Sequence, residues 1–91
     1  MIRVLVADEY NLFRKGLLTL LEEENNIIVV GEAENGNDLV EKYKQTKPDL
    51  IISDISMPIK SGITAIKKIR RSNKQVKVLF ISQYSGDDYI Y

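Results

Sequence analysis

Short apolar runs alternate along this chain with segments in which apolar residues recur at helical spacing. The apolar runs lie at residues 2–7, 27–30, 50–52 and 76–81. The apolar residues at helical spacing are Leu12, Phe13, Leu17, Leu20 and Leu21, then Leu39, Val40 and Tyr43, and finally Ile63, Ile66 and Ile69. Strands separated by helix-length connections form parallel sheets, and right-handed crossovers place helices on both faces. The sequence therefore predicts an α/β fold with a parallel sheet.

Breaker residues separate these elements. Asn25 and Asn26 end the first helical segment, and Lys47-Pro48 stops the second, because the residue before proline avoids helical geometry. We predict a turn at Gly36-Asn37 and a loop at residues 57–62. The glycines at these two places read as isolated turn glycines, so the chain contains no glycine-rich phosphate loop.

Acidic residues follow two of the apolar runs. Asp54 closes the third run, and Asp8 and Glu9 follow the first, while Ser82 follows the fourth. Ligands of open parallel sheets bind outside the carboxyl ends of the strands, where the strand order reverses. Carboxylates that meet there repel one another, which favours either a bound cation or a raised pKa. We therefore predict a chemical site at this edge.

Composition limits the chemistry of such a site. The chain has neither cysteine nor histidine, so thiolate catalysis, sulfur-bound zinc and imidazole catalysis are excluded. Thirteen Lys and Arg balance thirteen Asp and Glu, which gives no overall field that would attract nucleic acid. No run of about 18 apolar residues could span a bilayer. We expect a cytoplasmic protein with no membrane partner.

Four short motifs occur at the ends of the predicted strands and in the loop after the third. They are Ala7-Asp8-Glu9, Ser53-Asp54, Met57-Pro58 and Ile81-Ser82. In this order they resemble the receiver domain of bacterial response regulators. Residues 7–17 are similar, more narrowly, to receivers that precede a helix-turn-helix DNA-binding domain of the NarL/LuxR type. The resemblance covers residues 1–91.

The resemblance implies a flavodoxin-like, doubly wound parallel sheet with strand order 2-1-3-4. It implies a phosphoacceptor that takes a phosphoryl group from a sensor histidine kinase and assists its own phosphotransfer, rather than a turnover enzyme. The implied output is the control of DNA binding and transcription through an output domain that lies outside this chain.

Site residues are carried over from the family position by position. Asp54 matches the phosphoacceptor. Asp8, Glu9, Asp54 and the Ser56 backbone carbonyl match the ligands of Mg²⁺, and Met57 and Pro58 match a loop motif. Ser82 matches the hydroxyl that senses the phosphoryl group.

The family pattern continues beyond the matched segments. Family receivers carry a phosphate-pairing lysine on a fifth strand and end in a last helix. Neither Lys60 nor Lys77 fits that lysine, so we expect a receiver of residues 1–91 that is incomplete at its C-terminus. An uncovered fourth strand would favour a homodimer or edge-strand pairing.

Other functions and simpler explanations of these residues stay open. A pseudo-receiver or fragment could serve as a protein-interaction or dimerisation module without accepting a phosphoryl group. Asp8 and Glu9 could simply form an acidic turn before a helix, Asp54 could be a solvated loop acid, and Ser82 an ordinary strand-end hydroxyl. A haloacid-type phosphatase is disfavoured, because its second aspartate would fall at Ser56.

Overall fold

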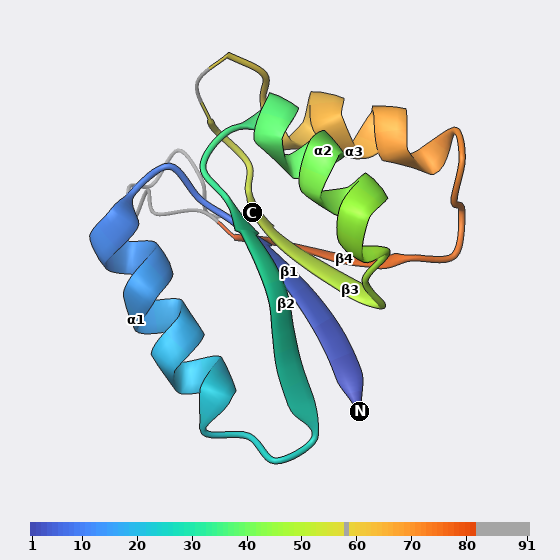
Figure 1. The fold of residues 1–91 in the computed structure, drawn as a ribbon. Helices are drawn as coiled ribbons and strands as arrows, with labels where there is room; N and C mark the ends of the chain where they lie inside the picture. Colours follow the sequence, from blue (N-terminus) through green and yellow to red (C-terminus); the bar gives the residue numbers. More distant parts are fainter. Residues whose placement is uncertain (58, 82–91) are drawn as a thin grey trace, which may run out of the picture.

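The computed structural model describes residues 1–57 and 59–81 and contains a single parallel sheet. Its elements are β1 (Ile2–Ala7), α1 (Asn11–Glu22), β2 (Ile27–Ala33), α2 (Gly36–Thr46), β3 (Leu50–Asp54), α3 (Gly62–Arg70) and β4 (Lys77–Ile81) (Figure 1). The strands lie in the order β2-β1-β3-β4, and every neighbouring pair is parallel. The predicted α/β class, flavodoxin-like doubly wound topology and strand order are therefore confirmed.

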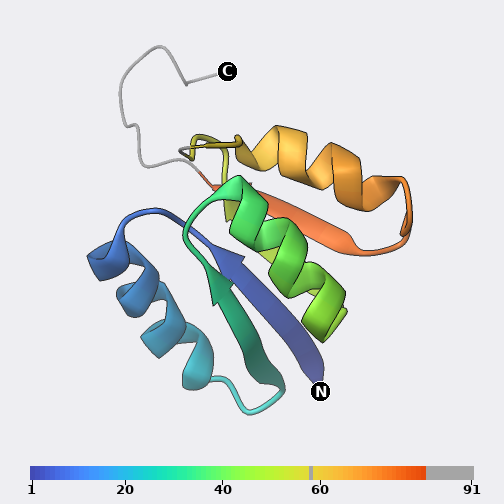
Figure 2. The same cartoon turned by 45° about the horizontal axis from the view of Figure 1, so that its top comes forward.

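Helices cover both faces of the sheet. Figure 2 shows α1 on one side and α2 with α3 on the other. Side chains alternate along β1, because successive residues of a strand point to opposite faces. Leu5 and Ala7 join the core under α2 and α3, whereas Val4 and Val6 join the core under α1.

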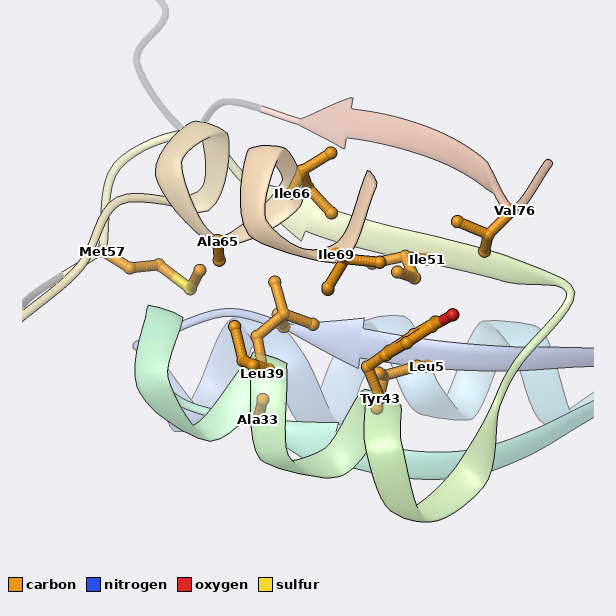
Figure 3. Close-up of a cluster of buried hydrophobic side chains, with 12 residues drawn as sticks. Leu5, Ala33, Leu39, Tyr43, Ile51, Met57, Ala65, Ile66, Ile69 and Val76 are labelled. Carbon is orange, nitrogen blue, oxygen red and sulfur yellow. The ribbon is translucent and has the colours of Figure 1, made fainter. Parts of the chain in front are cut away.

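The core under α2 and α3 is the larger one. Its buried members are Leu5, Ala7, Ala33, Leu39, Val40, Tyr43, Ile51, Met57, Ala65, Ile66, Ile69 and Val76. Figure 3 shows side chains from both helices converging on those of β1 and β3. The inward positions predicted for the second helix, Leu39, Val40 and Tyr43, are confirmed as buried.

The α1 side is packed more loosely. No residue of α1 is buried, and Leu17, Leu18 and Leu21 are only partly buried against Val4, Val6 and Ile52. Leu12 and Leu20 were part of the apolar spacing that predicted this helix, but they are 87% and 63% exposed. The helix is confirmed, although its inward face lies around Leu17, Leu18 and Leu21.

Element bounds differ from the prediction in two places. The apolar pattern predicted that the second strand ends at residue 30, but β2 continues to Ala33. Its pairing with β1 shifts register between Val4 and Leu5 of β1, which marks a bulge. The predicted turn at Gly36-Asn37 is wrong. These residues begin α2, and the Asn35 side chain caps it by accepting a hydrogen bond from the Asp38 amide at 2.8 Å.

The stop after α2 is confirmed. Lys47 follows the helix in a left-handed conformation with φ 46°, and Pro48 comes next. In the described part of the chain, no helix has both the length and the apolar character needed to cross a membrane.

Candidate functional site

The acidic residues predicted from the strand ends do meet at one edge of the sheet. Ala7 pairs with Ser53, so Asp8, the residue after β1, lies beside Asp54, the last residue of the adjacent strand β3. Asp8 is fully buried and Asp54 is 3% exposed. Burial excludes the alternative that Asp54 is a solvated loop acid.

Asp54 is held in an electrostatically unfavourable position. Burial raises the pKa of its carboxyl group above the ordinary value, and the nearby charges of Asp8 and Glu9 raise it further. Backbone hydrogen bonds from Ser56 and Ile55 oppose this shift. The Ser56 amide donates to Asp54 Oδ1 at 3.3 Å. The fold therefore keeps an acid where its ionised form lacks solvation and is repelled.

The start of α3 lies directly on the Asp54 backbone. A Cβ atom on Gly62 would come within 2.1 Å of the Asp54 carbonyl oxygen and 2.8 Å of Ser53 Oγ. The Gly62 amide donates to the Ile55 carbonyl at 3.0 Å, and the Ser53 hydroxyl donates to the Asp54 carbonyl at 2.9 Å. Gly62 is therefore required by close approach to the site, and its prediction as an isolated turn glycine was wrong.

The loop that follows Asp54 is also fixed from α2. A Cβ atom on Gly36 would lie 2.1 Å from the Lys60 carbonyl oxygen, so only glycine allows this approach. Met57, predicted as a loop residue, packs into the core under α2 and α3. Pro58, the other residue of that motif, lies outside the described residues.

The turn after β1 is held by hydrogen bonds. The Asp8 amide donates to the Ala33 carbonyl of β2 at 2.9 Å, and the Tyr10 amide donates to Asp8 Oδ1 at 2.8 Å. Arg14 of α1 donates from Nη1 to the Asp8 carbonyl at 2.5 Å. The Asp8 carboxylate therefore lies before α1 and accepts from the amide of its N-cap residue, Tyr10.

Two of these site residues escaped prediction from the sequence. Arg14 looks like any surface charge within a helix, and no local signal marks its contact with Asp8. Gly62 follows Ser61, which caps α3 through the Thr64 amide, and this capping pattern was the available signal that Gly62 begins a helix.

The acidic edge offers oxygen donors that a metal ion could bind. Carboxylate and carbonyl oxygens suit Mg²⁺, and the charge that raises the Asp54 pKa is the kind that a cation would relieve. Within residues 1–57 and 59–81, however, no group of three or more acidic side chains has the spacing to hold a metal ion. The predicted Mg²⁺ ligands Asp8, Glu9, Asp54 and Ser56 thus remain a prediction.

The pairing of β3 with β4 places the residue before Ser82 and one of the lysines weighed above. Ile81, the last residue of β4, pairs with Asp54, and its carbonyl accepts from the Ile55 amide at 3.1 Å. Ser82 follows Ile81 in the sequence but lies outside the described residues. Lys77 pairs with Leu50 at the opposite end of the sheet, as expected for a lysine with no role at Asp54.

Comparison with known proteins identifies the family. The model of the family described as response regulator receiver domain matches residues 4–91. The chain is 35% identical over 89 residues to the response regulator GacA of Pseudomonas viridiflava, which covers 98% of this chain and 42% of that protein. It therefore spans less than half the length of this relative.

Solved structures agree with the sequence match. The response regulator domain of Thermotoga maritima CheB superposes with a TM-score of 0.87 at 36% identity, covering 96% of this chain and 64% of that one. A LuxR-family two-component response regulator from Aurantimonas sp. SI85-9A1 superposes with a TM-score of 0.88 at 26% identity, covering 98% and 64%. The chain belongs to the response regulator receiver domain family of two-component systems.

Proposed function

We propose that this chain is a phosphoacceptor receiver domain that takes a phosphoryl group from a sensor histidine kinase onto Asp54. The observation that carries the proposal is the burial of Asp54 at the carboxyl edge of the sheet, beside Asp8 and Glu9, with its pKa raised. A carboxylate oxygen of Asp54 attacks phosphorus, the new bond joins oxygen to phosphorus, and the phosphorus–nitrogen bond of the donor histidine breaks. The chain acts as an acceptor rather than as a turnover enzyme.

Magnesium is the cofactor in this proposal. Asp8, Glu9, Asp54 and the Ser56 carbonyl would hold the ion, which would supply positive charge to offset the repulsion between Asp54 and an anionic phosphoryl group. The residues of the chain orient the acceptor. The Ser56 amide holds one oxygen of Asp54, and the close packing of Gly62 fixes the Asp54 backbone.

The names of the relatives support a regulatory output. Several are named as response regulators or transcriptional regulatory proteins, and the chain covers only part of each. We propose that the Ser82 hydroxyl senses the phosphoryl group and that the change controls dimerisation and a DNA-binding domain outside this chain. We propose the cytoplasm as the location of this chain, because the sensor kinase and the DNA-binding domain would both act there.

A beryllofluoride titration tests the proposal. With Mg²⁺ present, this phosphoryl mimic should shift the amide resonances of residues 54–57 and 8–9 in the wild type. Asp54→Asn should abolish the shifts, whereas Glu41→Gln, which removes an exposed acid on α2, should keep them. A folded wild type that does not respond would contradict the proposal and favour an interaction module without phosphotransfer.

A further inference from the structure

We propose that Arg14 is a positioning residue for the acidic turn, defined as residues 8–10, and that it acts through the main-chain carbonyl of Asp8. Arg14 Nη1 donates to this carbonyl at 2.5 Å from the first turns of α1. The acceptor of this bond is the main-chain carbonyl of Asp8, not its carboxylate. Arg14 therefore fixes the peptide that carries this carboxylate.

The guanidinium group of Arg14 joins three parts of the fold. Besides the Asp8 carbonyl after β1, Nε donates to Glu32 Oε1 of β2 at 2.8 Å, and Nη2 donates to Asn11 Oδ1 of α1 at 2.6 Å. A planar guanidinium offers donors in a fixed fork, so these three directions are set together. Lysine has a single nitrogen and could not reproduce this geometry.

Burial and charge indicate that this contact is stable. The Arg14 side chain is only 11% exposed, and its ion pair with Glu32 compensates the charge. Charge-assisted hydrogen bonds of this kind are stronger than those between neutral groups. The network therefore resists exchange with water better than a surface ion pair would.

Leu17, Leu18 and Leu21, which pack α1 on the sheet, lie beyond its first turn, so within residues 1–57 and 59–81 the polar network is what holds its beginning. No residue of α1 is buried, and Tyr10, at the N-cap, makes no capping hydrogen bond with its side chain. The Tyr10 amide holds the Asp8 carboxylate, while Arg14 holds the Asp8 carbonyl. Release of the carbonyl would remove one of the hydrogen bonds that orient Asp8 and would give its peptide and carboxylate more freedom to move.

The functional consequence rests on the proposed function, in which Asp8 is a ligand of Mg²⁺. Residues that orient metal ligands from outside the coordination sphere typically change metal affinity by about 10–100-fold. We therefore expect Arg14→Met to weaken Mg²⁺ binding by about tenfold. The same substitution should also speed hydrogen exchange of the Tyr10 amide in metal-free protein.

The experiment compares Arg14→Met with Lys15→Met. Lys15 is the neighbouring exposed cation of α1, so both variants lose one positive charge from the same helix. Mg²⁺ affinity and Tyr10 amide exchange are measured by NMR, and thermal melts report folding. Lys15→Met should match the wild type in both readouts. Arg14→Lys should recover part of the lost affinity, because its amine reaches one of the three acceptors.

Equal Mg²⁺ affinity and equal Tyr10 exchange in folded Arg14→Met and Lys15→Met would overturn the proposal. If Arg14→Met does not fold, the test uses Arg14→Lys instead. Mg²⁺ affinity and Tyr10 amide exchange equal to those of the wild type in Arg14→Lys would then overturn the proposal. A wild type that binds no Mg²⁺ would count against the proposed function instead. In that case the Tyr10 exchange of metal-free Arg14→Met still decides whether Arg14 positions the turn.

Discussion

The two faces of the sheet hold the acidic edge in different ways. On the face covered by α2 and α3, both helices bury side chains and approach the Asp54 loop so closely that only glycine fits at Gly36 and Gly62. On the α1 face no helical residue is buried, and the turn at Asp8 is held by hydrogen bonds from Arg14 and backbone amides. Asp54 is thus fixed by packing, and Asp8 by polar contacts.

This difference suggests a division of roles. Close packing tolerates no added atom, because protein interiors are dense and respond to each extra methyl group. A hydrogen-bonded turn can adjust by small rotations, which suits the proposed role of its residues as ligands of a cation. Substitutions near Asp54 should therefore affect folding, and substitutions near Asp8 should mainly affect binding.

The largest effect is expected from Gly62→Ala. Its new methyl group would overlap the Asp54 carbonyl, which is backbone and can move only with β3. We expect a loss of about 3 kcal/mol in the free energy of unfolding, the upper range for overpacking. Urea denaturation measures it. A stability within about 0.5 kcal/mol of the wild type, the range typical of neutral surface substitutions, would show that the packing at Asp54 is not tight.

Truncation of Leu39 should come next. This α2 side chain is fully buried in the core under α2 and α3, so Leu39→Ala should cost about 2 kcal/mol, the lower end of the range for a truncated buried leucine, through lost burial and a cavity. Leu20→Ala on the exposed side of α1 is the matched control, with an expected change within about 0.5 kcal/mol. Similar losses in both variants would remove the contrast between the faces.

Asp54→Asn should stabilise the metal-free protein by about 1 kcal/mol, the scale of a typical single substitution. Because the folded-state pKa is raised above 3.8, ionised Asp54 reduces stability at neutral pH. This cost is absent below the unfolded pKa and complete once the pH exceeds the raised value. The gain over the wild type should therefore disappear in acid. Urea denaturation of both proteins in the presence of a chelator, at several pH values, measures this difference in stability. An Asp54→Asn variant less stable than the wild type at neutral pH would contradict the prediction.

The smallest effect is expected from Gly16→Ala. A Cβ atom at this position of α1 meets nothing within 4 Å, and alanine favours helix over glycine by about 0.5–1 kcal/mol. The variant should melt slightly higher than the wild type in a thermal scan. A lower melting temperature would mean that α1 has no room for a methyl group at this position.

The sequence was sufficient to predict the elements and the acidic edge. Apolar periodicity predicted the strands and helices, the family resemblance implied the strand order, and acids at strand ends predicted that Asp8 and Asp54 meet. The contacts between distant segments could not be predicted. Gly62 against Asp54, Gly36 against Lys60 and Arg14 against Asp8 depend on how helices approach the sheet, which local spacing does not encode.

The face of α1 shows the same limit. Leucines are so frequent in this helix that spacing alone could not decide which of them face the sheet. Leu18 packs inward, while Leu20 is exposed. Burial depends on the rotation of the helix about its own axis, and that rotation is set by tertiary contacts such as those of Arg14.

Labelling with acetyl phosphate tests most directly whether Asp54 accepts a phosphoryl group. The wild type is incubated with acetyl phosphate and Mg²⁺, and the modified residue is located by mass spectrometry after chemical trapping of the acyl phosphate. We predict one label, on Asp54, that is lost in Asp54→Asn and after removal of Mg²⁺. A folded wild type that binds Mg²⁺ but takes no label, or a label that persists in Asp54→Asn, would contradict this function.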